Sequence, residues 1–309
     1  MVHSFMGASD MKKYFLQIAL FFAIVAVVDV AVGKLFRYVQ ANRAGGRTRA
    51  EWYACRVSNE DIIIMGSSRA SHHYVPQIIS DSLGMSCFNA GQDGNGIILQ
   101  YGRWKMISER YAPKVLIYDV TPGFDLQEND NMAYVDRLKP FCDDREVKKY
   151  VSGIFPMERW KLFSQMYRYN YKFLEMLSDC NKSKDDKLYG YIPLHGQIRK
   201  EVVEGESKTK VKAIEFDETK LQYLERLAQE CKAKNTQLIF VVSSYFNGGS
   251  YNEESFSPIS DIAAKYGLHF YYLNELEFTD NPNLFKDSYH LNDEGSKAFT
   301  AELIHRITS

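Results

Sequence analysis

The sequence predicts an α/β fold built on a parallel, doubly wound sheet. Five short apolar runs recur along the chain, and segments with helical periodicity fill most of the gaps between them. Buried strands that alternate with helices are typical of a sheet whose strands all run in the same direction. The chain has 309 residues and is 45% hydrophobic, which is enough for one sizeable core. The expected strands are residues 61–65, 85–89, 114–120, 236–243 and 268–273.

A membrane span is the first expected element. Residues 14–32 are almost entirely apolar, are interrupted only by Gln17 and Asp29, and are flanked by lysines. Their number is close to the roughly 20 residues that cross a hydrocarbon core. A cleaved signal peptide is the alternative, but this run is longer than a typical apolar signal region, and no small-x-small cleavage site follows it. We therefore expect residues 1–35 to be a single-pass anchor in a lipid bilayer.

The side of the membrane on which the main domain lies is a separate question. Five basic residues follow the span between positions 34 and 49, whereas Lys12 and Lys13 precede it. By the positive-inside rule, this count would leave the domain in the cytoplasm. A long folded domain behind an N-terminal span with a Lys-Lys start nevertheless commonly translocates, so we expect an extracytoplasmic domain.

The part of the chain after the anchor divides into a stem and a main domain. Residues 36–57 are polar and are expected to form a helical juxtamembrane stem, and residues 58–309 are expected to form the domain. An insert at about residues 122–216, rich in Tyr, Lys, Trp and Met, interrupts the strand–helix alternation. Such an insert could cover a site at the sheet edge, with aromatic rings that stack on sugars. The alternative is that residues 160–177 are a helix that buries its apolar face.

A serine follows the first strand. The strand ends at Gly66, which permits a sharp turn, and a helix is expected over residues 69–83. This arrangement would hold Ser68 at the carboxyl edge of the sheet, with backbone N–H groups at the helix start available to an oxyanion. The alternative is that Ser67 and Ser68 only cap the helix.

A carboxylate and an imidazole stand near the other end of the chain. Asp287 precedes His290 by three residues, just before a helix that is expected to start near Asn292. In one tight turn, this spacing lets the carboxylate reach one ring nitrogen while the other faces outward, as a general base requires. If the fold brings this turn to Ser68, the three groups form a nucleophile, a base and a carboxylate that orients the base. The alternative is an ordinary surface turn.

The order of these elements resembles that of the SGNH (GDSL-like) hydrolases, a flavodoxin-like family with three α/β/α layers. The resemblance covers roughly residues 60–120 and 236–305. It implies that Ser68 is the nucleophile and that Asp287 and His290 complete the triad.

The resemblance also implies an oxyanion hole formed by the backbone N–H groups of Ser68 and Gly91. The chain departs from the family pattern after the third strand, where Asp-Val-Thr-Pro at residues 119–122 replaces the usual Gly-x-Asn-Asp. The asparagine donor is therefore missing at this position. Asn95, in the turn after the second strand, is a candidate to replace this donor. The alternative is that Asn95 is only a turn residue that tolerates a left-handed backbone.

Five further polar side chains lie near the expected triad in the predicted fold. Ser67, in the position where the family usually has aspartate, is expected to line the substrate site, and so is Ser244 at the end of the fourth strand. Arg69 would either bind an anionic substrate or pair with an acidic neighbour. His72 and His73 are near enough to reach the site, but adjacent residues point in different directions on a helix, so at least one should face solvent.

The resemblance implies an activity. We expect a membrane-anchored serine esterase or O-acyltransferase that acts on acyl esters, above all acetyl esters, of an envelope or extracellular polysaccharide. The implied partners are an acylated carbohydrate and a membrane-bound O-acyltransferase. The alternatives are a catalytically weak polysaccharide-binding scaffold and a lipid esterase at the membrane surface.

Composition argues against two classes of protein, those that bind nucleic acid and those that bind a metal through cysteines. The net charge is −1, which provides no basic field for nucleic acid, and the five cysteines lack the spacing of metal ligands. We expect no metal and no cofactor.

Overall fold

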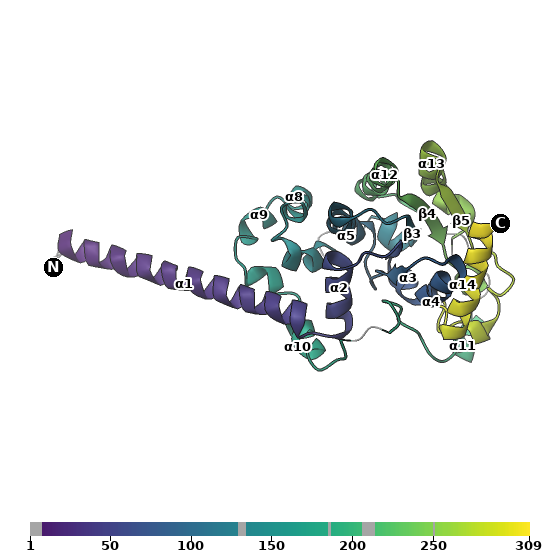
Figure 1. Cartoon of the computed structure of the whole chain (residues 1–309), viewed down its shortest axis with the longest axis horizontal. Helices are drawn as coiled ribbons and strands as arrows, with labels where there is room; N and C mark the ends of the chain where they lie inside the picture. Colours follow the sequence, from purple (N-terminus) through teal and green to yellow (C-terminus); the bar gives the residue numbers. More distant parts are fainter. Residues whose placement is uncertain (1–7, 129–133, 185–186, 206–213, 250) are drawn as a thin grey trace.

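The computed structural model describes residues 8–128, 134–184, 187–205, 214–249 and 251–309. Its core is a five-stranded sheet in which every paired strand runs parallel to its neighbour, in the order β2-β1-β3-β4-β5 (Figure 1). This is the strand order of the flavodoxin-like doubly wound fold. All five predicted strands are confirmed: β1 (Ile62–Gly66), β2 (Cys87–Asn89), β3 (Val115–Asp119), β4 (Gln237–Val242) and β5 (His269–Tyr272).

Helices surround the sheet on both faces. The α-helices in the described ranges are α1 (Ala8–Asn42), α2 (Gly46–Arg56), α3 (Ser68–His73), α4 (Pro76–Leu83), α5 (Ile97–Arg110), α6 (Pro122–Asp125), α8 (Arg145–Ile154), α9 (Glu158–Lys161), α10 (Phe173–Asp179), α11 (Lys200–Gly205), α12 (Glu218–Ala233), α13 (Ser257–Tyr266) and α14 (Asp293–Thr308). Short 3₁₀ turns are η1 (Asp136–Phe141), η2 (Tyr167–Tyr169), η3 (Phe246–Gly248), η4 (Glu253–Phe256) and η5 (Pro282–Leu284).

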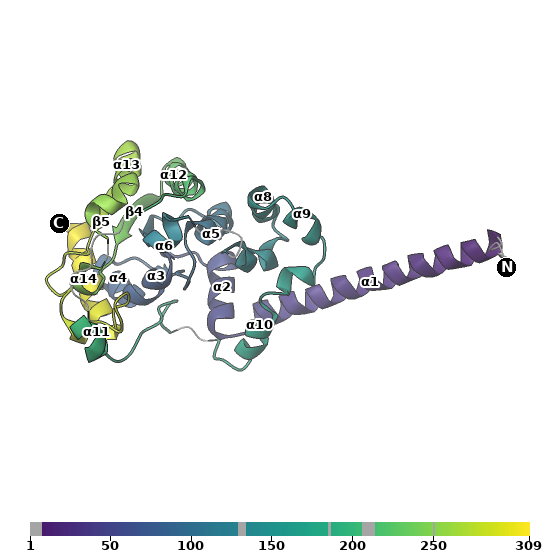
Figure 2. The same cartoon turned by 180° about the vertical axis from the view of Figure 1, so that it is seen from behind.

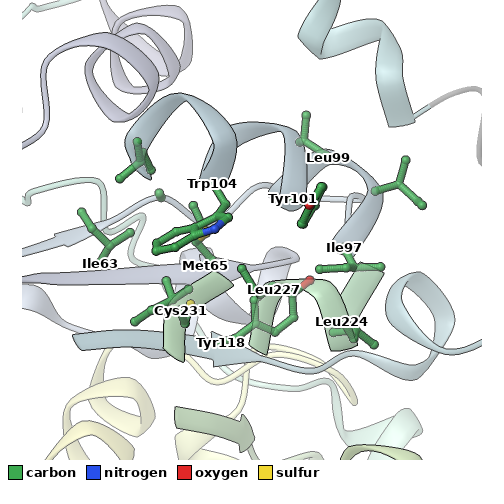
Figure 3. Packing of buried hydrophobic residues seen from close by; sticks show 14 of the residues in the cluster. Ile63, Met65, Ile97, Leu99, Tyr101, Trp104, Tyr118, Leu224, Leu227 and Cys231 are labelled. Atoms are coloured by element: carbon green, nitrogen blue, oxygen red, sulfur yellow. The ribbon is translucent and has the colours of Figure 1, made fainter. Parts of the chain in front are cut away.

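Side chains alternate between the two faces of the strands and so build two cores. Ile63 and Met65 of β1 pack with α5 and α12, where Trp104 is fully buried (Figure 3). Ile62 and Ile64 point to the opposite face and pack with α3, α4 and α14. Each buried large apolar side chain stabilises the fold by about 1.5–3 kcal/mol. The sheet is therefore a central layer that is covered on both sides.

The segment after β1 differs from the single helix predicted over residues 69–83. Tyr74 and Val75 are extended between α3 and α4, and Pro76 is the first residue of α4. Proline disfavours the helical conformation of the residue before it and lacks an N–H for the preceding turn, so the helix breaks here. As a result α3 is short and turns its last residues, His72 and His73, inward.

The expected stem is divided between two helices. The apolar helix α1 continues without a break to Asn42, and by length and composition it suits a membrane anchor or a signal sequence. The helix α2 packs against α5, and its residues Ala54 and Cys55 belong to the main core. Residues 46–56 are therefore part of the folded domain.

The aromatic part of the insert, around α9 and α10, lies beside α1 and away from α3 (Figures 1 and 2). Residues 160–177 form no single helix but the short turns and helices α9, η2 and α10. Phe36 of α1 contacts Tyr169 and Phe173, with ring centroids 5.6 and 5.3 Å apart. The interpretation of these aromatics as a cover over the site is wrong.

Candidate active site

The structure brings together the serine, histidine and aspartate that lie far apart in the sequence. Ser68 is the first residue of α3 and Oγ lies 2.8 Å from His290 Nε2. His290 Nδ1 lies 3.0 and 3.1 Å from the two carboxylate oxygens of Asp287. The network assigns the proton to Nδ1, because a carboxylate only accepts, and leaves Nε2 to accept the Ser68 hydroxyl proton.

The loop that carries Asp287 and His290 is fixed at its base and at its tip. Its base is closed by a β-bridge between Phe285 and Leu291, both of which are fully buried. At its tip, Asp287 Oδ1 accepts hydrogen bonds from the backbone N–H groups of Tyr289 and His290 at 2.8 and 2.9 Å. One carboxylate therefore shapes the turn and orients the imidazole, which is what the Asp-x-x-His spacing permits.

Burial and hydrogen bonding act in opposite directions on Asp287. Burial raises its pKa, but the hydrogen bonds and the charge of His290 and the N–H groups of the turn outweigh that effect, so the pKa is lowered from its usual value. The carboxylate is thus ionised wherever His290 can act as a base.

The three side chains lie at the protein surface. The His290 side chain is 23% exposed, the Asp287 side chain is 50% exposed, and Ser68 is half-buried. A substrate much larger than a single ester can therefore reach the serine without entering a deep cavity.

The two expected oxyanion donors differ in whether their backbone N–H groups are already hydrogen-bonded. The backbone N–H of Ser68, in the first turn of α3, has no hydrogen-bond partner within the described ranges. The N–H of Gly91 instead donates to the Asn89 side-chain oxygen at 3.0 Å. The expectation that Gly91 is a free donor is therefore wrong, because Asn89, at the end of β2, folds over it.

The Asn95 side chain donates to the backbone oxygen of Asp93 at 2.9 Å, within its own turn. It acts as a turn residue, so its assignment to the oxyanion hole is also wrong. Gly94 in the same turn is exposed and has a left-handed φ of +68°, as a tight turn with glycine allows.

The segment that lacks the family asparagine, residues 119–122, forms hydrogen bonds inside the protein. Thr121 Oγ1 lies 2.6 Å from Ser67 Oγ, and its backbone N–H donates to Asp125 at 2.7 Å. Ser67 is fully buried. Because its hydroxyl points to Thr121 inside the protein, the expectation that Ser67 lines the substrate site is wrong.

Arg69 and Ser244 are also buried and do not line the site as expected. The Arg69 guanidinium donates to the backbone oxygens of Val120 and Ser243 at 2.6 and 2.8 Å, and it stacks on the ring of Tyr245 at 4.1 Å. It therefore joins the carboxyl ends of β3 and β4. Ser244 Oγ donates to the backbone oxygen of Leu273 at 2.6 Å. Both side chains satisfy buried backbone groups that follow the strands.

Both histidines of α3 are buried, contrary to the expectation that one faces solvent. His73 Nδ1 lies 2.9 Å from Ser243 Oγ, and its Nε2 accepts the N–H of Leu291, the residue after His290. Burial lowers the pKa of His73 well below its usual value, so the ring is neutral. His73 thus positions the loop that carries the base, a role that no local sequence pattern announces.

His72 lies between the site and a charged turn. Its Nδ1 is 2.7 Å from the backbone oxygen of Ile192, and its Nε2 is 3.3 Å from Asp93 Oδ1. The His72 and His290 rings are perpendicular, with centroids 5.6 Å apart. No group of three or more His, Cys, Asp or Glu side chains in the described ranges could hold a metal ion.

The chain has only weak similarity to known proteins. No protein-family model and no curated protein matches the sequence. Among solved structures, it is similar to LAE5, an alpha/beta hydrolase enzyme from the metagenome of Lake Arreo, Spain, with a TM-score of 0.40, 10% identity, and coverage of 80% of this chain and 94% of the other. It is also similar to a mutant of Axe2, an acetyl-xylooligosaccharide esterase from Geobacillus, with a TM-score of 0.38 and the same identity and coverage. Likenesses this weak carry no argument about activity, which must come from the site.

Proposed function

We propose that this protein is a serine esterase or O-acyltransferase that acts on acyl esters of an envelope or extracellular polysaccharide. The observation that carries the proposal is the distance of 2.8 Å between Ser68 Oγ and His290 Nε2, with Asp287 on the opposite ring nitrogen. A serine hydroxyl becomes a nucleophile when such a base can take its proton.

The reaction has two steps. In the first, His290 Nε2 takes the Ser68 proton while Oγ attacks the ester carbonyl, and the developing oxyanion is stabilised by the N–H of Ser68. Asp287 stabilises the imidazolium, which then gives its proton to the departing alcohol. In the second step, water or a sugar hydroxyl attacks the acyl group on Ser68, His290 takes the attacker's proton, and Ser68 regains its hydrogen.

The position of the site supports a polymer as the substrate. The catalytic loop is exposed, and α3 and α14 lie toward the end of the domain away from the free half of α1 (Figures 1 and 2). A serine at that end is better placed for a polysaccharide than for an ester buried in a bilayer. Acetyl as the acyl group follows from the family resemblance.

Activity is tested on the purified full chain with a small acetyl ester. We expect Ser68→Ala to abolish turnover without a change in the unfolding transition, and Ser67→Ala, the adjacent buried serine, to keep at least about a tenth of it. Turnover that survives Ser68→Ala would remove this serine from the mechanism. Binding of an acylated glycan without any turnover in the unaltered protein would favour the scaffold alternative.

Membrane anchoring by α1, an extracytoplasmic domain and cooperation with a membrane-bound O-acyltransferase belong to the same proposal. A membrane-impermeant fluorophosphonate probe applied to intact cells tests sidedness. We expect it to label Ser68 in the unaltered protein and to leave Ser68→Ala unlabelled. Labelling only after the cells are broken open would place the domain inside.

A further inference from the structure

The free part of α1 ends at a defined level of the domain. Residues 11–28 are exposed along their whole length, and protein contacts begin at Asp29. Its carboxylate accepts hydrogen bonds from the Ser164 hydroxyl at 2.5 Å and from the N–H groups of Gln165 and Met166 at 2.7 and 3.0 Å.

A close backbone approach fixes this junction. A Cβ added to Gly33 would lie 2.2 Å from the Cβ of Gln165, so only glycine lets the loop pack here. The 18 free residues from 11 to 28 span about 27 Å, close to the roughly 30 Å of a hydrocarbon core. From Asp29 onward the domain contacts one side of α1, while Val30, Leu35 and Tyr38 on the same helix stay exposed.

Large apolar side chains surround this junction and face outward. Trp160 is 69% exposed, and Met157, Phe163 and Leu174 are exposed to a similar degree. They belong to α9, α10 and the loop between them, the part of the domain beside α1 (Figures 1 and 2). Soluble surfaces rarely gather such side chains, whereas tryptophan and phenylalanine are favoured at the membrane–water interface.

Basic side chains without a carboxylate partner stand next to these apolar residues, and two of them, Lys148 and Arg159, lie over the rings of Phe163 and Trp160. A cavity of about 720 Å³ is lined by Met157, Trp160 and four cations, and none of the four has a carboxylate within 4.0 Å in the described ranges. The cations are Arg145, Lys148, Lys149 and Arg159.

A second cavity, of about 510 Å³, links this site to the anchor helix. Arg145 and Lys148 line it as well, together with Lys34 and Arg37 of α1. Asp143 and Asp144 line this second cavity too, and Asp143 pairs with Arg37, so the four cations without a carboxylate partner named above are those of the first cavity. We call the surface around the first cavity the insert surface, defined by Arg145, Lys148, Lys149, Arg159, Met157, Trp160 and Phe163.

We propose that the insert surface binds the anionic phospholipid headgroups of the membrane that α1 spans. The cations receive the phosphates, while Met157, Trp160 and Phe163 enter the interface between headgroups and acyl chains. The inference rests on α1 being a membrane helix, as in the proposed function, and its experiment separates the two. With α1 and the insert surface both on the bilayer, the domain has one orientation, and Ser68 is held away from the lipid.

Trp160 supplies a direct measurement, because the chain has three tryptophans and Trp104 is fully buried. The full chain is reconstituted into lipid nanodiscs that contain phosphatidylserine, with or without bromine on the acyl chains. We expect brominated lipid to quench a component of the emission that disappears in Trp160→Phe. A protein that enters the discs but shows no such component would overturn the insert surface and leave the anchor intact. Failure to enter the discs would overturn both.

The charges are tested by reversal. Arg145→Glu, Lys148→Glu and Arg159→Glu are combined in one variant, and Lys232→Glu, Lys265→Glu and Lys297→Glu, on α12, α13 and α14, in a matched control. In the unaltered protein and the control, we expect Trp160 quenching to be about twofold stronger in discs with phosphatidylserine than in phosphatidylcholine alone. The first variant should lose that difference. Equal quenching in both lipids for the unaltered protein would show that the cations do not bind headgroups.

Ester turnover by Ser68 serves as the check of folding for the first variant, because α8 and α9, which carry its three cations, lie toward α1 and away from α3 and α14 (Figures 1 and 2). A first variant that keeps its turnover and its unfolding transition, yet also keeps the lipid difference, would overturn the proposed role of the three cations.

Discussion

At the scale of single residues, Asp287 combines a structural and a chemical role. Its oxygen holds two backbone N–H groups of the turn and one ring nitrogen of His290. The lowered pKa of Asp287 means that it binds a proton only at a pH below its usual range. The carboxylate therefore stays charged through the usual range of an aspartate.

The lowered pKa of Asp287 predicts one feature of the pH profile. Protonation of this carboxylate should cause no loss of kcat/KM for an acetyl ester until the pH falls below the usual range of an aspartate. Steady-state rates measured as the pH is lowered test this. A loss of activity caused by protonation of Asp287 within its usual range would contradict the lowered pKa.

Replacing the carboxylate tests its role directly. Asp287→Asn should reduce kcat by about 10³-fold or more, since the imidazole loses its orientation and the imidazolium its counter-charge. Steady-state rates at neutral pH measure the loss, and near-normal turnover in this variant would remove Asp287 from the mechanism.

Arg69 is a second residue whose neighbours decide its role. Arg69→Met should lower the free energy of unfolding by about 3–5 kcal/mol, because it leaves Asp119 and two backbone oxygens buried without their partner. Urea denaturation measures the loss. Arg47→Met, which removes an ion pair of a partly exposed arginine with Asp93, is the control and should cost about 0–1 kcal/mol. Similar losses in the two variants would contradict the structural role of Arg69.

At the scale of elements, the position of α3 depends on the turn after β2. A Cβ added to Gly91 would lie 2.4 Å from the backbone nitrogen of Ser71 and 2.8 Å from the carbonyl carbon of Ala70, both in α3. The turn and the helix therefore touch through their backbones. Any side chain at Gly91 must move the helix that carries Ser68.

Gly91→Ala should consequently impair activity, although Gly91 is not one of the three triad residues. We expect a loss of at least about tenfold in kcat with a cost of about 1–3 kcal/mol in stability, because overpacking displaces α3. Ester turnover and thermal unfolding measure the two effects. Gly84→Ala is the matched control: it has a left-handed φ of +64° but nothing within 4 Å of an added Cβ, so it should lose stability only. Full activity in Gly91→Ala would show that α3 tolerates the displacement.

At the scale of the whole molecule, α2 connects the apolar helix α1 to the domain that contains the sheet. Ala54 and Cys55 lie in the main core, and Glu51 pairs with three cations, of which Arg103 and Lys172 are buried and Arg137 is partly exposed. A chain without α2 would leave these cations without the carboxylate of Glu51. It would also remove Ala54 and Cys55 from the main core.

This arrangement predicts where the domain can be cut. A chain that begins at residue 44 should fold cooperatively, whereas one that begins at residue 58, the boundary expected from the sequence, should be insoluble or lack a cooperative transition. Circular dichroism on heating distinguishes the two. Cooperative unfolding of the shorter chain, at a temperature similar to that of the longer one, would show that α2 is dispensable.

The sequence by itself determined the features that depend on local spacing. Apolar runs predicted all five strands, Gly66 predicted the turn before Ser68, and the spacing of Asp287 and His290 predicted a tight turn in which the carboxylate reaches one ring nitrogen. These features follow from backbone geometry over a few residues.

Only the tertiary structure decided the features that depend on distant neighbours. It brought Ser68 to His290, buried Arg69 between the ends of β3 and β4, and turned the N–H of Gly91 toward Asn89. It also set the aromatic insert beside α1 (Figure 1). Whether a polar side chain faces substrate or fills a gap depends on which backbone groups the packed elements leave unsatisfied, and those groups come from parts of the chain that no local pattern connects.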